Sequence, residues 1–246
     1  PYPTDNDAEY WRDAFNNRGA ANRVIYDPTA SDTRPTFAGV IGGESIITSG
    51  LILNLDGNNY TSGTTWTDTS GQGNNGTLVN GVGYSSENGG VLTFDGTNDY
   101  INVGSTTDFD FGTGSFTVET WVYINSGNAT VVHGQTTNSG TFGFVLYQSG
   151  SVSYFFKAGG AAVTFNLPIV SNQWFHIACV RNGSTDFTVY MNGVAAGFSN
   201  AFNVNITSSA GVQIGAQAGG MGGNLLNGIL GAVRMYKGKA LTETEI

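Results

Sequence analysis

The chain has 246 residues, of which 11% are charged, a formal net charge of −9 and a single cysteine. A negative charge with few lysines and arginines opposes attraction to nucleic-acid phosphates and anionic lipid, so we expect neither a nucleic-acid partner nor membrane insertion. No apolar run approaches the roughly 18 residues of a membrane span, and one cysteine excludes an internal disulfide.

The first 49 residues differ in composition from the rest. They hold four of the five prolines and show no β alternation, and residues 7–15 favour a short helix capped by Asp5 or Asp7. Such a segment has no core of its own, so we expect 1–49 to be an arm that anchors the chain on this domain or on a neighbouring subunit. A flexible linker is the alternative. The anchoring side chains are predicted to be Tyr10, Trp11, Phe15, Tyr26 and Phe37.

Residues 50–246 predict one β domain. Residues 51–55 form its first strand, 56–59 a turn, and Trp66 precedes an irregular loop rich in glycine and asparagine over 68–78. Residues 91–95 and 100–103 predict a hairpin around the turn at 96–99, and residues 116–124 predict a long strand.

Short apolar runs bounded by Gly, Asn or Ser then recur about every ten residues, a spacing typical of all-β domains. They cover residues 130–134, 141–148, 151–157 and 161–166, and strands over 212–215 and 229–236 come later. Because no helical pattern separates these runs, they favour an antiparallel sandwich over βαβ units.

The stretch 173–194 predicts two consecutive hairpins. Its two Asn-Gly pairs, at 182–183 and 192–193, are strong hairpin signals because a type I′ turn needs positive φ at both central positions. Both faces of the strand over 174–180 are apolar, so a second sheet should cover at least one of them. Cys179 is expected to be a small buried hydrophobe and His176 a core or half-buried histidine.

The strands W-x-H-x-A-x-V and V-Y-x-N-G-V within 174–194, with segments 68–78, 94–100, 116–122 and 228–236, resemble in this order the laminin-G-like, concanavalin A-like jelly-roll family. The resemblance runs from about residue 51 to the last residue and implies an all-β, antiparallel jelly-roll β-sandwich. The family includes lectins, accessory modules of hydrolases, adhesins and virion proteins. The chain begins at Pro1 and stops where related sequences continue, so we expect it to be a processed or partial product.

Carboxylates argue against catalysis. Glycoside hydrolases on this sandwich place paired carboxylates on one strand, one as nucleophile and one as acid. This chain has six glutamates without such a run, and Glu119, which shares a strand face with Trp121, is the one in a strong strand. The prediction is that the chain is not an enzyme. His133 and His176 form no recognisable zinc motif.

Calcium is the one metal that the resemblance implies. Hard cations need several oxygen ligands, and relatives often hold Ca²⁺ through an aspartate and backbone carbonyls at the sandwich edge. The candidate ligands here are Asp56, Asp68, Asp95 and Asp99. The alternative is that these side chains form ordinary Asx turns.

A cell-surface glycan is one candidate partner, since glycan recognition on sandwiches uses aromatic platforms flanked by polar loops. The candidate platform residues are Trp66, Tyr84 and Tyr147, with Tyr60 and Tyr154 as further candidates. Most aromatics in such a chain belong to the core, which is the alternative for each of them.

The stretch 50–81, with the arm before it, resembles laminin-G-like domains of virion proteins from tailed phages of aquatic bacteria. This resemblance implies a structural or adhesive virion component. Such a component is expected to be oligomeric, and its arm to bind other subunits of the particle. A secreted or cell-surface bacterial carbohydrate-binding or adhesin module is the second interpretation, and a glycoside hydrolase the third.

Overall fold

The structure is a computed structural model that describes residues 46–104, 107–126, 129–134, 142–146, 153–157, 162–165, 167, 169–199, 202–206, 211–216 and 225–246. The arm residues Tyr10, Trp11, Phe15, Tyr26 and Phe37 and the predicted helix at 7–15 lie outside these ranges. Among the described residues no helix has the length and apolar character needed to cross a membrane.

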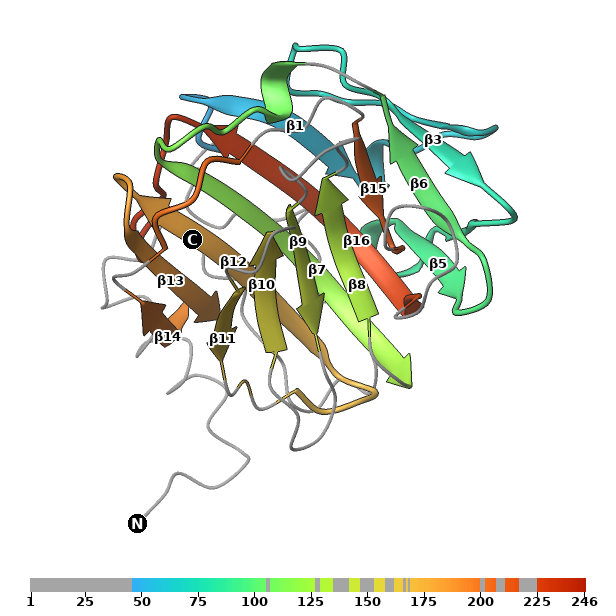
Figure 1. Cartoon of the computed structure of the whole chain (residues 1–246). Coiled ribbons are helices and arrows are strands. Elements are labelled where there is room, and N and C mark those ends of the chain that lie inside the picture. Colours follow the sequence, from blue (N-terminus) through green and yellow to red (C-terminus); the bar gives the residue numbers. More distant parts are fainter. Residues whose placement is uncertain are drawn as a thin grey trace, which may run out of the picture.

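Two antiparallel eight-stranded sheets lie face to face (Figure 1). Sheet A has the order β14-β13-β12-β7-β16-β5-β4, and β1 also pairs with β16. Its strands are β1 (Leu51–Asp56), β4 (Gly83–Ser85), β5 (Val91–Asp95), β7 (Phe116–Ser126), β12 (Trp174–Asn182), β13 (Asp186–Met191), β14 (Val194–Ser199) and β16 (Asn227–Lys237).

Sheet B has the order β11-β10-β9-β8-β15-β6-β3-β2. Its strands are β2 (Thr65–Trp66), β3 (Gly76–Val79), β6 (Tyr100–Val103), β8 (Ala129–Gly134), β9 (Phe142–Leu146), β10 (Ser153–Lys157), β11 (Ala162–Phe165) and β15 (Val212–Ile214). Three short 3₁₀ helices, η1 (Gly57–Asn59), η2 (Glu87–Gly89) and η3 (Thr107–Phe109), connect strands. The predicted antiparallel sandwich is therefore confirmed.

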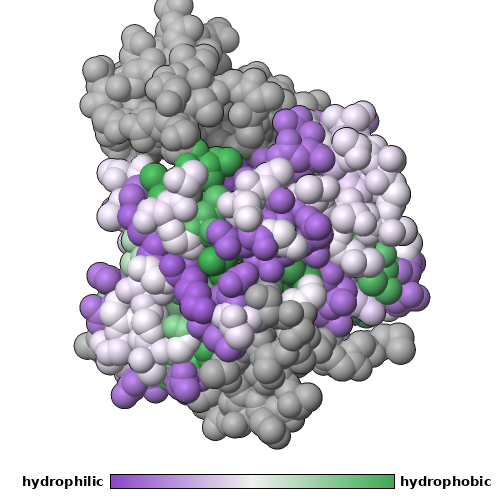
Figure 2. All heavy atoms as spheres, turned by 90° about the horizontal axis from the view of Figure 1, so that it is seen from above, coloured by the Kyte–Doolittle hydropathy of each residue, from purple (hydrophilic) through white to green (hydrophobic). Residues whose placement is uncertain are grey.

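The core lies between the sheets because the strands alternate. In β7 every second residue from Phe116 to Ile124 is buried in the main apolar cluster or beside it. The residues between them, Thr117, Glu119, Trp121 and Tyr123, occupy the outer face of sheet A. Cys179 is buried in the core as expected. Figure 2 shows the molecule from above, where hydrophilic residues surround limited hydrophobic areas.

The two predicted hairpins form, with different turns. Met191 pairs with Val194, and Asn192 and Gly193 both have positive φ, of 52° and 75°, as a type I′ turn requires. In the first hairpin Asn182 still pairs with Asp186, so three residues form the loop and only Gly183 has positive φ. Pairing of Asn182 in the ladder keeps its backbone extended, and the predicted two-residue turn is wrong here.

The predicted hairpin over 91–103 is also wrong. Both strands exist, but β5 pairs with β4 and β16 in sheet A, whereas β6 pairs with β3 and β15 in sheet B. The connection turns the chain from one layer to the other, and Asp95 stabilises it by accepting from the backbone N of Thr97 at 2.7 Å. Local turn residues do not decide whether a following strand stays in the same sheet.

Arg181 fastens one end of the sandwich. Its guanidinium is wholly buried and donates to the carbonyls of Gly114, Val204, Gly112 and, at 3.4 Å, Phe111. Burial lowers the pKa of Arg181 to about 10, so the group is still protonated at neutral pH. A buried cation with four carbonyl acceptors holds the segments before β7 and around residue 204 together.

The C-terminal residues fold back on sheet A. Leu241 packs with Leu51 and Tyr236 in a second small apolar cluster, and Ile47 and Ile246 pack against it. The backbone N of Leu241 also donates to the Thr117 hydroxyl at 3.0 Å. The described domain thus includes residues from before position 50.

Candidate functional site

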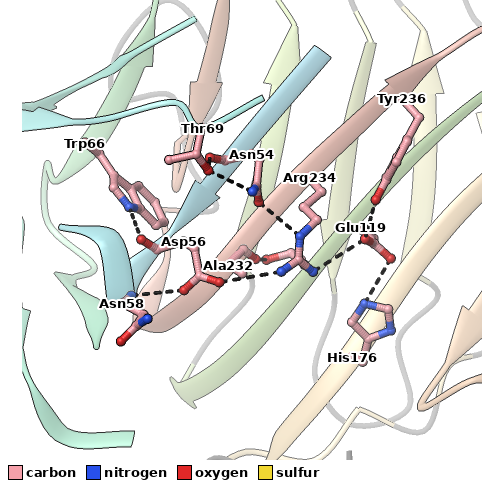
Figure 3. A network of polar contacts seen from close by, with 11 residues as sticks. Asn54, Asp56, Asn58, Trp66, Thr69, Glu119, His176, Ala232, Arg234 and Tyr236 are labelled. Carbon is pink, nitrogen blue, oxygen red and sulfur yellow. Dashed lines mark hydrogen bonds and ion pairs between the residues drawn. The ribbon is translucent and has the colours of Figure 1, made fainter. Parts of the chain in front are cut away.

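A polar network crosses the outer face of sheet A (Figure 3). At its centre the Arg234 guanidinium lies between two carboxylates, with Nη1 3.6 Å from Glu119 Oε1 and Nη2 3.5 Å from Asp56 Oδ2. On the far side of Glu119, Oε2 lies 3.4 Å from Nε2 of His176. Four strands, β1, β16, β7 and β12, therefore contribute to one chain of polar and charged side chains.

Strand register builds this network. Arg234 pairs with Asn54 on one side and with Glu119 on the other, and Glu119 pairs with Ala178 on its second side. These residues share the outer face because their strands are in register and side chains alternate along each strand. A register shift in β16 between Leu230 and Ala232 determines whether the odd- or the even-numbered residues after it face outward.

Glu119 is held as a carboxylate. Burial by itself would raise its pKa, but the hydrogen bond and charge of His176, with the charge of Arg234 and the hydroxyl of Tyr236, outweigh burial and lower the pKa. The same burial and the Glu119 charge raise the pKa of Tyr236, which donates to Oε1 at 3.4 Å. At neutral pH Glu119 has no proton to give and its oxygens are occupied.

The network extends to the loop after β2. Arg234 Nε donates to the Asn54 side-chain oxygen at 3.0 Å, and the Asn54 amide donates to the Thr69 hydroxyl at 2.8 Å. Trp66 Nε1 donates to the carbonyl of Asp56 at 2.9 Å. Every member thus has a structural partner, and the arrangement fixes strands to one another.

Trp66 is a core residue, so its prediction as a glycan platform is wrong. Its side chain is completely buried in the main cluster. Side chains alternate between the two faces of β2, so Thr65 is exposed and Trp66 faces the core, although the loop that follows is polar. The predicted platform residue Tyr147 lies outside the described residues. Tyr154, the further candidate, belongs to β10, but its side chain is outside the described part of the structure.

Tyr84 is exposed and has an aromatic neighbour. Its side chain on β4 is 40% exposed, and its ring centroid lies 4.8 Å from that of Tyr60, with 42° between the planes. The Tyr60 hydroxyl donates to the carbonyl of Gly63 at 2.5 Å, which fixes that ring. No described residue bonds the Tyr84 hydroxyl. We name this pair the Tyr60–Tyr84 platform.

Two glycines bring the tyrosines together. Gly57, the first residue of η1, packs so closely on Gly90 that a Cβ at Gly57 would clash with the carbonyl oxygen of Gly90. Gly90 itself has φ of +93°, which side-chain-bearing residues rarely adopt. This backbone contact draws the loop that begins at Asp56 against the segment after β4, and Tyr60 lies beside Tyr84 as a result.

The platform is bordered by polar side chains. Asn58, Asn59, Thr61 and Ser62 are exposed on one loop, and Ser86 is exposed on the other. An aromatic surface with amide and hydroxyl groups around it can stack on the apolar face of a sugar ring and bond its hydroxyls.

The four candidate calcium ligands have separate partners. Asp68 accepts from the backbone N of Asn54, Ser70 and Asn74, and Asp56 accepts from Asn58 N and pairs with Arg234. Within the described ranges no three His, Cys, Asp or Glu side chains gather where they would bind a metal.

Asp99 differs from the other candidates, because one of its carboxylate oxygens has no hydrogen-bond partner. Its Oδ2 accepts from the backbone N of Asp95 at 3.1 Å, while Oδ1 is buried without a partner. Burial raises the pKa of Asp99, the bond from the Asp95 backbone lowers it, and the charge of Asp95 raises it, with a net increase. Among the described residues the four candidate aspartates therefore do not gather into one calcium site.

Sequence reasoning singled out Glu119, Tyr84, Tyr60 and His176, but it did not indicate which of them pair, and it missed Arg234. Arg234 and His176 come from strands 115 and 57 residues away from Glu119 along the chain, so no local spacing joins them. A signal did exist, since Arg234 interrupts an apolar strand and a charged residue there needs a counter-charge.

Known proteins share this fold. A family model described as the concanavalin A-like lectin/glucanases superfamily matches residues 95–246. A search of curated proteins finds no match. Domain 4 of AbnA, a GH43 extracellular arabinanase from Geobacillus stearothermophilus solved with arabinotriose, is 19% identical with a TM-score of 0.62, over 80% of this chain and 96% of that chain.

Two other solved structures are larger. The receptor-binding domain of botulinum neurotoxin C/D mosaic serotype gives a TM-score of 0.62 at 16% identity, over 80% of this chain and 50% of that one. Trypanosoma rangeli sialidase gives 0.64 at 16% identity, over 96% of this chain and 37% of that one. Likeness at such identity concerns the fold, while the family match covers most of the chain. This chain therefore belongs to the concanavalin A-like lectin/glucanase superfamily.

Proposed function

We propose that the chain is a non-enzymatic carbohydrate-binding module of a larger assembly, and that the Tyr60–Tyr84 platform binds the glycan. The observation that supports this site is the exposed ring of Tyr84, held against the half-buried ring of Tyr60 between two polar loops. The lectin-like family and a similar domain solved with arabinotriose support the ligand class.

A glycan array followed by calorimetry tests the site. Tyr84→Ala should weaken binding at least about tenfold, the equivalent of 1.4 kcal/mol, because the stacking surface is lost. Phe198→Ala is the matched control, since Phe198 is 63% exposed on β14 at the other end of sheet A. Equal affinity of wild type and Tyr84→Ala would exclude the platform.

The absence of catalysis is supported by the state of the carboxylates. Glycoside hydrolysis needs one protonated and one ionised carboxyl group flanking the bond. Glu119 is buried and ionised among His176, Arg234 and Tyr236, and Asp56 is engaged by the same arginine. Release of reducing ends from a polysaccharide by the wild type, abolished in Glu119→Gln, would overturn this part of the proposal.

The larger assembly is a bacteriophage virion in this proposal, with residues 1–49 as the arm that attaches the module and the domain facing outward. The proposal rests on the sequence resemblance and on the aromatic content of the arm. A secreted or cell-surface adhesin is the competing context. Fixed stoichiometry of the chain in purified particles separates the two.

Deletion of the arm tests its role. Because Ile47 packs against the small apolar cluster at Leu241, the deletion should end at residue 45. The shortened chain is expected to fold but to be absent from assembled particles, whereas Phe198→Ala should be incorporated normally. Incorporation of the shortened chain at full occupancy would exclude an anchoring arm.

A further inference from the structure

Within residues 46–246, few positive charges are free to meet a ligand. Five of the nine lysines and arginines fall within residues 46–246: Lys157, Arg181, Arg234, Lys237 and Lys239. Arg181 is wholly buried against backbone carbonyls, and Arg234 is shared by Asp56 and Glu119. Neither arginine therefore offers a charge at the Tyr60–Tyr84 platform.

The lysines lie away from the platform. Tyr84 pairs with Leu92 of β5, and Leu92 pairs with Leu230 of β16. Leu230 is therefore the residue of β16 that lies level with the platform. Lys237 is the last residue of β16, and at roughly 3.3 Å per residue it lies about 20 Å farther along the strand. Lys239 follows it and is paired with Glu245 at 2.7 Å.

Lys157 belongs to the other end of the sandwich. It ends β10, which neighbours β11, and β11 contacts β14 at one end of sheet A (Figure 1). Tyr84 is on β4, the last strand at the opposite end of the sheet order. In the described part of the chain, no lysine or arginine borders the platform.

The exposed charge nearest the platform along the described chain is negative. Glu87 is exposed three residues after Tyr84, whereas Asp56, at the start of the loop that holds Tyr60, is buried and its charge is balanced by Arg234. The exposed groups between them are the neutral amides of Asn58 and Asn59 and the hydroxyl of Ser86. A carboxylate on a ligand would meet like charge here without a cation to pair with.

Resting on the proposed function, we infer that the Tyr60–Tyr84 platform takes uncharged glycans and rejects sialylated or uronic-acid glycans. A neutral sugar needs only the ring face of Tyr84, its free hydroxyl and the neighbouring amides. Because no ion pair contributes, binding should be insensitive to salt.

The test uses the full chain and glycans that differ only in charge. Suitable pairs are a lactose-terminated oligosaccharide with its sialylated form, and methyl-esterified homogalacturonan with its de-esterified form, beside an array of neutral glycans. The expected result is binding of neutral glycans that is lost in Tyr84→Ala, unchanged by 0.5 M NaCl, and at least about tenfold weaker for each acidic counterpart.

A charge reversal sharpens the test. Glu87→Lys should raise the affinity for acidic glycans at low salt, and added salt should remove the gain. Asp186→Lys is the matched control, because Asp186 is an exposed acid on β13, away from the platform. The control should leave the neutral-to-acidic ratio unchanged.

The two levels of the proposal fail differently. Acidic glycans that bind as tightly as their neutral counterparts, with loss in Tyr84→Ala, would overturn the selectivity and leave the carbohydrate site intact. Binding that is absent throughout, or that survives Tyr84→Ala, would overturn the site and the selectivity together.

Discussion

Glu119 of β7 and Arg234 of β16 stand directly opposite each other on the outer face of sheet A, and Glu119 Oε1 lies 3.6 Å from Arg234 Nη1. In the family's glucanases a carboxylate on a strand face has a catalytic role, as the sequence resemblance implies. Here Arg234 pairs with one oxygen of the Glu119 carboxylate, and His176 contacts the second oxygen. The pair therefore links β7 to β16 across the outer face of sheet A.

Glu119→Gln should lower the free energy of unfolding at pH 7 by about 3 kcal/mol, the lower end of the cost of breaking a buried ion pair, because Arg234 keeps Asp56 as a partner. Urea denaturation measures the change. Glu87→Gln, at an exposed glutamate, is the control and should change stability little. Equal stability of the two variants would contradict a stabilising role for Glu119.

The same pair predicts a pH dependence. The folded-state pKa of Glu119 lies below its ordinary value, so its stabilisation is present above the unfolded pKa of about 4.3 and is lost as pH falls through the folded pKa. Wild type should therefore lose more stability than Glu119→Gln between pH 7 and pH 3. Parallel pH profiles in denaturation experiments would exclude this contribution.

Trp66→Ala should destabilise the fold by about 3–5 kcal/mol, because a fully buried indole is removed and its bond to the Asp56 carbonyl is lost. Trp66→Phe should cost less, since most of the buried surface remains. Thermal melts provide the comparison. A Trp66→Ala variant with the wild-type melting temperature but without glycan binding would restore Trp66 as a platform residue.

Gly57→Ala should destabilise the protein by about 1–3 kcal/mol and also weaken glycan binding, although it touches neither tyrosine. The added Cβ would clash with Gly90 and separate the loops that hold Tyr60 and Tyr84. Gly104→Ala is the control, because a Cβ there meets no atom. Calorimetry measures the glycan affinity of both variants. Unaltered binding in Gly57→Ala would show that the glycine contact does not position the platform.

Calcium should leave the melting temperature unchanged, since the described residues offer one orphaned carboxylate oxygen at Asp99. A real site would stabilise the fold by roughly 2.7 kcal/mol at a hundredfold excess over Kd. Melts with EDTA and with added Ca²⁺ make the measurement. A Ca²⁺-dependent rise that disappears in Asp99→Asn would establish a site that the carboxylate arrangement does not indicate.

The sequence predicted features whose cause is local. Alternation in 116–124 and 174–180 gave the central strands, because side chains on successive residues of a strand point to opposite faces. The Asn192-Gly193 turn followed from the positive φ that these two residues tolerate. Segment order likewise indicated the sandwich.

Other features depend on which strands become neighbours. Residues 91–103 look like a hairpin, yet β5 and β6 lie in different sheets because each finds its hydrogen-bond partners elsewhere. Trp66 looks like a loop aromatic, yet it fills the core. The pairing of Tyr60 with Tyr84 depends on the backbone contact between Gly57 and Gly90, which are 33 residues apart in sequence.

The sequence by itself thus determined the all-β class, the central strands and the scarcity of positive charge from residue 46 onward. Only the tertiary structure decided that the Glu119 carboxylate is paired with Arg234 and His176, and that two tyrosines meet at one edge. Composition and alternation act within a few residues, whereas ion pairs and aromatic contacts form between strands brought together by sheet register.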